Sequence, residues 1–172
     1  DGGLFSSDFR ASERTAQLIL QVAGRAGRAQ RPGRVLLQTR HPSHPVIHAL
    51  IQGGYPAFSE VCLKERESLL LPPFSHQALI RADASRRENA RDFLQSLTDS
   101  STVTMPAEVM VLGPVPSPME RRGNRYRWQL LLQAARRSDL HQALSRIQHA
   151  HRQDKKRWNV RWSIDVDPID LY

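Results

Sequence analysis

The sequence is poor in cysteine and in long hydrophobic runs. Cys62 is the only cysteine among the 172 residues, so no disulfide can form within the chain and no cluster of thiolates can hold zinc. No apolar run approaches the ~20 residues that a membrane-spanning helix needs. Residues 1–10 have neither the basic stretch nor the apolar stretch of a secretion signal. These absences favour a protein of the reducing cytoplasm that has no membrane partner.

Lysine is also scarce, although the chain is basic. The sequence has 25 lysines and arginines against 17 acidic residues, a formal net charge of +8, and its only lysines are Lys64, Lys155 and Lys156. A guanidinium binds phosphate through two parallel N–H bonds and stacks on bases, whereas an ammonium is a hydrated point charge. The composition therefore favours a phosphate-bearing partner, unless the arginines only replace lysines on a solvated surface.

Pro72-Pro73 separates two segments with different patterns. The first segment predicts a helix over residues 12–26 and a short buried strand over residues 33–39. It also predicts a helix that starts at Pro45 and ends at Gly53-Gly54, and a further helix over residues 55–71. One strand with three helices cannot form a sheet by itself, so we expect residues 1–72 to be the end of a larger α/β domain.

The second segment, residues 73–172, has the pattern of a complete small domain. The predicted elements are a strand at 77–82, a helix at 86–98, strands at 109–115 and 125–133, a helix at 139–151 and a strand at 160–166. The order βαββαβ is that of the ferredoxin-like fold, in which two helices cover one face of a four-stranded antiparallel sheet. We therefore expect an α+β domain here.

The stretch QVAGRAGR, residues 21–28, is the most informative motif. Gln21, Arg25 and Arg28 lie at i, i+4 and i+7, so they share one helical face or helix end. Gly24 and Gly27 each cost about 1 kcal/mol relative to alanine inside a helix, which indicates a backbone that approaches a partner closely. The motif predicts a polyphosphate clamp. A helix C-terminus with glycine stops and dipole-favoured arginines is the alternative explanation.

These eight residues resemble motif VI, Q-x-x-G-R-x-G-R, of superfamily 2 helicases. The wider sequence is similar to the primosomal protein N′ family of replication-restart DNA helicases, over essentially the whole chain. The similar stretches are DGGLFSSDFRASER (1–14), residues 33–39, YPAF (55–58), Glu65-Arg66, LPPF (71–74), VLGPVP (111–116) and IDVDPID (164–170). The resemblance implies that residues 1–72 end a RecA-like helicase lobe 2. Residues 73–172 would then form the family's C-terminal domain, similar in fold to ribosomal protein S10.

The resemblance also implies roles for the motif residues. Arg25 and Arg28 would reach the β- and γ-phosphates of ATP, with Arg28 as the arginine finger. Gln21 would position the γ-phosphate or a water, and Gly24 and Gly27 would lie against ATP. ATP, Mg²⁺ and zinc are thus cofactors of the whole protein. The chain itself has no G-x-x-x-x-G-K-[ST] loop and no cysteine-rich zinc region, so we expect it alone neither to hydrolyse ATP, nor to unwind DNA, nor to bind zinc.

A second candidate site is the run RRGNRYRW, residues 121–128. It alternates arginines with aromatic residues across a turn; these residues are Arg121, Arg122, Arg125, Tyr126, Arg127 and Trp128. The pattern offers phosphate contacts and base-stacking surfaces within a few residues, and so predicts a DNA-binding hairpin. In a strand, however, Tyr126 and Trp128 share one face, so the alternative is that both belong to the core.

Basic residues also bracket the last predicted helix: Arg136, Arg137, Arg152, Lys155, Lys156 and Arg157. Arg136 and Arg137, with Gln142, are our candidates for binding an acidic peptide, and a solvated face is the alternative. The resemblance implies such a partner in the tail of the single-stranded DNA-binding protein. It further implies branched and single-stranded DNA and other primosome proteins as partners, and a place at the nucleoid in the bacterial cytoplasm.

Two clusters have side chains that metals use. The first is His41, His44 and His48, but prolines interrupt the helix that would align them, so a polar loop entering a helix explains them better than zinc. The second is Asp165, Asp167 and Asp170, which can hold magnesium. Solvation at the strand end, or pairing with Arg161, explains these aspartates without a metal, and we expect no metal site in this chain.

The function that the sequence predicts follows from the resemblance. The chain is expected to be the C-terminal part of an ATP-dependent 3′-to-5′ DNA helicase that recognises stalled or abandoned replication forks and initiates primosome assembly. Its share of that work is expected to be the ATP-sensing arginines and the binding of forks and partners. The alternative is a non-enzymatic nucleic-acid-binding module of ribosomal-protein type that uses the same arginine-rich hairpin.

Overall fold

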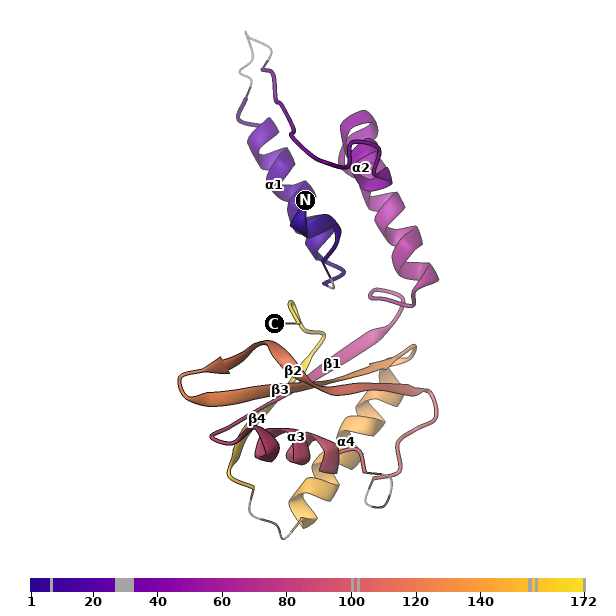
Figure 1. The fold of residues 1–172 in the computed structure, drawn as a ribbon. Helices are drawn as coiled ribbons and strands as arrows, with labels where there is room; N and C mark the ends of the chain where they lie inside the picture. The colour runs from indigo at the N-terminus through magenta and orange to yellow at the C-terminus, as the bar shows by residue number, and fades with distance from the viewer. Residues whose placement is uncertain are drawn as a thin grey trace. The chain divides into compact units, whose positions relative to one another are not determined.

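A computed structural model of the chain describes residues 1–6, 8–26, 33–99, 101, 103–154, 156 and 158–171 (Figure 1). The chain divides into two compact units, Asp1–Leu71 and Pro72–Tyr172. Each unit has a hydrophobic core of its own. In the part of the chain that is described, no helix is both long enough and apolar enough to cross a membrane.

The first unit contains the 3-10 helix η1 (Gly2–Leu4) and the helices α1 (Ala11–Ala23) and α2 (Pro45–Ser68). Gly54 interrupts α2 with φ 65° and ψ −159°, a backbone conformation that essentially only glycine adopts. The predicted break at this position is therefore confirmed, and the two predicted helices are the two arms of α2. The core between α1 and α2 buries Ala16, Val46, Leu50, Phe58 and Cys62.

The strand predicted over residues 33–39 is wrong. These residues have no regular secondary structure, and Val35, Leu36 and Leu37 are exposed, Leu36 to 87%. A strand needs a neighbour to pair its backbone N–H and C=O groups. Among the described residues of the first unit there is no other strand, so the apolar side chains of this segment have no sheet to join.

The second unit has the predicted βαββαβ order. Its elements are β1 (His76–Ala84), α3 (Arg87–Ser96), β2 (Val109–Arg122), β3 (Arg125–Ala134), α4 (Arg137–Gln153) and β4 (Val160–Val166). The strands form one antiparallel sheet in the order β2-β3-β1-β4. Both helices lie on one face of this sheet (Figure 1). The prediction of an α+β domain with a four-stranded antiparallel sheet is confirmed.

Alternate residues of the strands build the core of the second unit, because successive side chains of a strand point to opposite faces. Ile80 on β1 and Leu130 and Leu132 on β3 are fully buried against Phe93 of α3 and Leu140 of α4. The intervening residues point to the opposite side of the sheet, which we call the outer face. Its polar residues on β1, β3 and β4 are Gln77, Arg81, Asp83, Arg125, Arg127, Gln129, Gln133, Arg161, Ser163 and Asp165.

Candidate nucleotide and nucleic-acid sites

The described part of the QVAGRAGR motif lies at the C-terminal end of α1. Gln21 is in the last turn of the helix, Gly24 caps it, and Gln21 and Arg25 are both exposed. The backbone forms a further turn after the cap, in which the N–H of Arg25 donates to the carbonyl of Val22 at 3.1 Å. Gly27 and Arg28 lie outside the described residues. The site therefore presents a carboxamide and a guanidinium at one helix end.

The conformation of Gly24 bears on why the motif has a glycine there. Its φ of −64° and ψ of −17° are right-handed and helical, so it is not the left-handed glycine of a helix stop. A Cβ on Gly24 would meet only the carbonyl oxygens of Leu20 at 3.4 Å and Gln21 at 3.9 Å, which are ordinary contacts. The fold of this unit thus does not require glycine at position 24. This geometry is compatible with close approach of a partner to the backbone, and the position of Gly24 at the end of α1 agrees with the alternative of a helix C-terminus.

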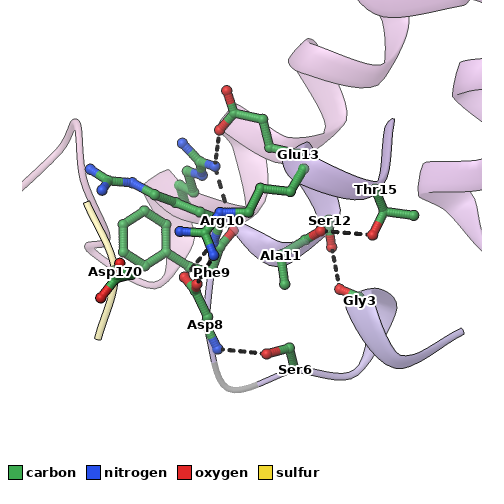
Figure 2. Close-up of polar contacts among 12 residues, drawn as sticks. Gly3, Ser6, Asp8, Phe9, Arg10, Ala11, Ser12, Glu13, Thr15 and Asp170 are labelled. Atoms are coloured by element: carbon green, nitrogen blue, oxygen red, sulfur yellow. Dashed lines mark hydrogen bonds and ion pairs between the residues drawn. The ribbon is translucent and has the colours of Figure 1, made fainter. Parts of the chain in front are cut away.

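Polar residues that precede the motif, for which the sequence predicts no role, form a network in the structure (Figure 2). Asp8 is only 3% exposed. Its N–H donates to Ser6 Oγ at 3.1 Å, its Oδ1 accepts the N–H of Arg10 at 2.9 Å, and its Oδ2 lies 3.2 Å from Arg14 Nη1. These contacts fix the start of α1 and thereby the direction in which the helix carries Gln21.

A second set of contacts ties α1 to α2. Arg66 Nη2 donates to Glu13 Oε2 at 3.0 Å, and its guanidinium lies 5.0 Å from the centre of the Phe9 ring. Glu13 is in the first turn of α1 and Arg66 in the last turn of α2, so this ion pair joins the two helices at one end. The only indication of this network in the sequence is the presence of an aspartate, a phenylalanine and arginines just before a helix.

The predicted DNA-binding hairpin joins β2 and β3. Its tip is Gly123-Asn124, and both residues have positive φ values, 56° and 58°, as the tight two-residue turn of a hairpin requires. Tyr126 and Trp128 point to the helix-covered side, where Trp128 packs against the core. The ring of Tyr126 lies under the guanidinium of Arg121, 5.5 Å away. The placement of Trp128 favours the core alternative for that residue.

The four arginines of the hairpin do not form one cluster. Arg121 lies on Tyr126 and donates to Asn124 Oδ1 at 3.3 Å. Arg125 forms an ion pair with Asp83 of β1 through Nε, and its Nη2 donates to the Asp83 carbonyl at 2.7 Å. Arg122 is exposed at the hairpin tip, and Arg127 points to the outer face. The hairpin thus presents cations in two places, its tip and the outer face.

The candidate residues for an acidic partner are engaged by carboxylates of the chain itself. Arg136 Nε donates to Asp139 Oδ2 at 2.9 Å, and this hydrogen bond raises the pKa of the Arg136 guanidinium. Arg137 Nη2 donates to Asp167 Oδ2 at 2.8 Å. Gln142 is exposed on α4. Lys155 and Arg157 lie outside the described residues. An acidic peptide therefore has to compete with Asp139 and Asp167 for these arginines.

The histidine and aspartate clusters have structural partners. His44 Nδ1 accepts the N–H of Val46 at 3.3 Å and so caps α2, and the rings of His41 and His44 meet Phe5 edge to face. Asp165 accepts from Arg81 Nη1 at 3.0 Å. Pairing of Asp165 with Arg161 is thus wrong, because Arg161 lies four residues away on the same strand, whereas Arg81 lies on the neighbouring strand β1. Within the described ranges, no three His, Cys, Asp or Glu side chains are grouped so as to hold a metal ion.

Comparison with known proteins decides the family. The model of the primosomal protein N C-terminal domain matches residues 67–169. The chain belongs to this family. It is 46% identical to replication restart protein PriA of Haemophilus influenzae, over 99% of this chain and 23% of that protein. The proteins of the same name from Synechocystis and Bacillus subtilis are 34% and 31% identical, over 99% and 98% of this chain and 20% and 21% of theirs.

The resemblance read from the sequence is therefore confirmed at the level of the family. The match to the primosomal protein N C-terminal domain begins at residue 67 and so covers the second unit, whereas the alignments with the three PriA proteins also cover residues before it. The chain spans between a fifth and a quarter of the length of these relatives. The QVAGRAGR motif, residues 21–28, lies outside the matched domain.

Proposed function

We propose that this chain is the C-terminal part of an ATP-dependent 3′-to-5′ DNA helicase that recognises abandoned replication forks and starts primosome assembly in the bacterial cytoplasm, at the nucleoid. The observation that carries the proposal is the identity to replication restart proteins over nearly the whole chain, together with the QVAGRAGR motif. Residues 1–72 end the RecA-like helicase lobe 2. Residues 73–172 are the DNA- and partner-binding domain, similar in fold to ribosomal protein S10.

The motif residues act on ATP in the whole protein. Gln21 and Arg25 are exposed at one helix end, and Gly24 leaves the backbone accessible, so this donor set fits the phosphates of a nucleotide. ATP hydrolysis supplies the energy for unwinding, Mg²⁺ accompanies the nucleotide, and zinc belongs to a part of the whole protein outside this chain. The exposed apolar side chains of Val35, Leu36 and Leu37 support the lobe assignment, because they are suited to burial against another part of the complete protein.

The test of this role uses the full-length protein. Arg28→Ala is expected to lower ATP turnover by about 10³-fold or more, as loss of an arginine finger does, while DNA affinity is unchanged. Arg34→Ala, which removes an exposed arginine outside the motif, is the matched control and is expected to keep full turnover. Unchanged turnover in Arg28→Ala would remove the assignment.

The β2–β3 hairpin binds DNA through its tip. Arg122 is exposed there, and Arg121 lies over Tyr126 beside it, so the two guanidiniums are placed for phosphate contacts. Fluorescence anisotropy of the 172-residue chain on forked DNA, plain duplex and single strand tests this over a series of salt concentrations. Replacing both arginines by alanine is expected to weaken fork binding and to reduce the salt slope by about 0.9 per lost contact. An unaltered salt slope would mean that the hairpin is a solvated surface that does not contact DNA phosphates.

The same salt series distinguishes a fork-recognising domain from the alternative, a non-enzymatic nucleic-acid-binding module. Tighter binding to the fork than to the other two DNAs at every salt concentration supports a fork-recognising domain. Equal and steeply salt-dependent binding to all three favours the non-enzymatic module of ribosomal-protein type, whose affinity is electrostatic alone.

Arg136, Arg137 and Gln142 receive the acidic tail of the single-stranded DNA-binding protein, and other primosome proteins assemble on the same domain. The ion pair between Arg137 and Asp167 gives this proposal a specific test. Asp167→Asn removes the competing carboxylate and is expected to tighten binding of an acidic tail peptide, whereas Arg137→Ala weakens it. No change in either variant places the peptide elsewhere.

A further inference from the structure

Arginines from three neighbouring strands meet on the outer face of the sheet. In the register of the sheet, Arg127 of β3 and Arg161 of β4 lie on either side of Asp83 of β1. Arg81 lies in the next row, between Gln129 and Ser163. Two strand spacings, about 10 Å, thus separate the backbones of Arg127 and Arg161. Their long side chains can reach the space between them.

This space is hollowed. A depression of about 320 Å³ is lined by Arg81, Arg127 and Arg161 and by one acidic residue, Asp83, and Ser117 and Ser163 add hydroxyl groups to its wall. Trp162 also borders it, but its ring lies against Phe93 and His151 of the core, with centroids 5.5 and 4.9 Å away. The depression therefore offers three arginines against one aspartate, together with hydroxyl groups, and its one aromatic ring packs against the core.

The ion pairs of the outer face leave two of its guanidiniums without a carboxylate. Arg125 engages the carboxylate of Asp83, and Arg81 is shared between Asp165 at 3.0 Å and Asp170 at 3.6 Å. Across the described residues, no carboxylate pairs with Arg127 or Arg161. The depression thus carries positive charge that the chain itself does not balance.

Unbalanced guanidiniums beside hydroxyl groups are the chemistry that binds phosphate. The depression has the size of a small-ligand site and is recessed in a sheet. A stiff duplex meets such a surface only at its rim, whereas a single strand bends into it. With no ring free for stacking, contacts to the backbone phosphates dominate, so binding does not depend on base sequence.

We propose that the outer face of the second unit binds the phosphates of single-stranded nucleic acid between Arg127 and Arg161. The inference rests on the proposed DNA-binding function and extends it. It adds β1 and β4 to a contact surface that the sequence predicts only at the hairpin. Arg122, which opposes Arg125 in the β2–β3 register, continues this surface to the hairpin tip. A strand bound there crosses the sheet from β4 toward the tip.

The test measures anisotropy of the 172-residue chain on labelled oligo-dT over a salt series. Arg127→Gln combined with Arg161→Gln is expected to lower the salt slope by about 1.4, which is about 0.7 for each lost phosphate contact on a single strand. The matched control is Arg86→Gln combined with Arg152→Gln. It removes the same charge before α3 and within α4, away from the outer face, and is expected to keep the slope. Thermal unfolding checks that both variants are folded.

A second variant is expected to have the opposite effect on oligo-dT binding. Asp83→Asn removes the carboxylate that lies between Arg127 and Arg161, and it is expected to tighten oligo-dT binding. An equal loss of slope in the outer-face variant and its control means that only net charge matters, and overturns the inference. Binding to a polyglutamate peptide that depends on Arg127 and Arg161, without binding to oligo-dT, also overturns it, because the occupant is then an acidic protein segment.

The failure of this inference can be told apart from the failure of the proposed function. Loss of binding in the Arg121 and Arg122 variants, with an unchanged slope in the outer-face variant, overturns the inference and leaves the hairpin assignment standing. If the unaltered chain binds none of the DNAs, both fall.

Discussion

At the scale of single residues, Gly24 and Gly54 differ in why they are glycine. Gly54 has a conformation essentially reserved for glycine, whereas Gly24 is helical. We expect Gly54→Ala to lower the free energy of unfolding by about 1–3 kcal/mol. Gly24→Ala is expected to raise it by up to about 1 kcal/mol, because alanine restricts the unfolded chain. Denaturant unfolding of the 172-residue chain measures both values.

The same substitution has a second readout in the full-length protein. If the backbone at Gly24 approaches a nucleotide, a methyl group there obstructs it, and ATP turnover falls although stability does not. A Gly24→Ala variant that retains both stability and full turnover would show that position 24 has no role at the nucleotide. Gly54→Ala is the control for a loss of turnover that stems from instability alone.

Asp154 gives a prediction about pH. Its Oδ2 accepts the indole N–H of Trp158 at 2.6 Å and its Oδ1 accepts the N–H of Lys156 at 2.8 Å, and these bonds, the first more than the second, lower its pKa below the ordinary 3.8. The folded pKa lies below the unfolded one, so the contact stabilises the fold above pH 3.8 and is lost as the pH falls through the lowered value.

The indole N–H resonance of Trp158 reports this titration in an NMR spectrum of the intact chain. Its chemical shift is expected to change with a midpoint below pH 3.8, and Asp154→Asn is expected to abolish the change. A midpoint above pH 3.8 would contradict the hydrogen bond as described. The resonances of Trp128 and Trp162 serve as internal references.

At the scale of elements, the exposed apolar segment 33–39 tests whether another part of the full-length protein covers it. Leu36 is 87% exposed, so Leu36→Glu is expected to leave the melting temperature of the 172-residue chain unchanged. In the full-length protein the same change is expected to lower stability if, as proposed, another part of the protein covers this segment, because a charge is then buried. Ile47→Glu, at a buried position of α2, is expected to lower stability in both proteins. A neutral effect of Leu36→Glu in both proteins would show that no part of the full-length protein covers this segment.

Elements whose hydrophobic residues recur with a clear helix or strand period were predictable from the sequence. Elements that depend on pairing with a distant segment were not. The strand predicted at 160–166 is β4, whereas β2 continues from the predicted 109–115 to Arg122. The prolines of that stretch look like a strand end, but β2 is an edge strand, where prolines are tolerated. The candidate site follows the same rule. Alternation predicted that Tyr126 and Trp128 share one face and left open whether that face is the core, which the structure shows for Trp128. The ion pair of Arg125 with Asp83 depends on a register between residues 42 positions apart.

At the scale of the whole molecule, the two units have cores of very different size. Among the described residues, the core of the second unit buries residues from β1, β2, β3 and both helices, and partly buried residues of β4 pack against it, whereas the core of the first unit buries Ala16, Val46, Leu50, Phe58 and Cys62. Since apolar burial is the main favourable term in folding, the second unit should be the more stable. The exposed apolar residues 35–37 are a further reason to expect the first unit to be the less stable one.

Hydrogen exchange of the intact chain tests this difference. We expect the amides of β1 and β3 to exchange most slowly, since these central strands are paired on both sides, and those of α1 to exchange through opening of the first unit alone. Residues 72–172 expressed by themselves are expected to unfold cooperatively at the same denaturant concentration as in the full chain. Equal protection in both units, or a shifted transition, would mean that the second unit draws stability from the first. If the second unit folds alone, its outer face stays formed whatever the state of the first unit, and the fork and oligo-dT affinities proposed above are then expected to survive removal of residues 1–71.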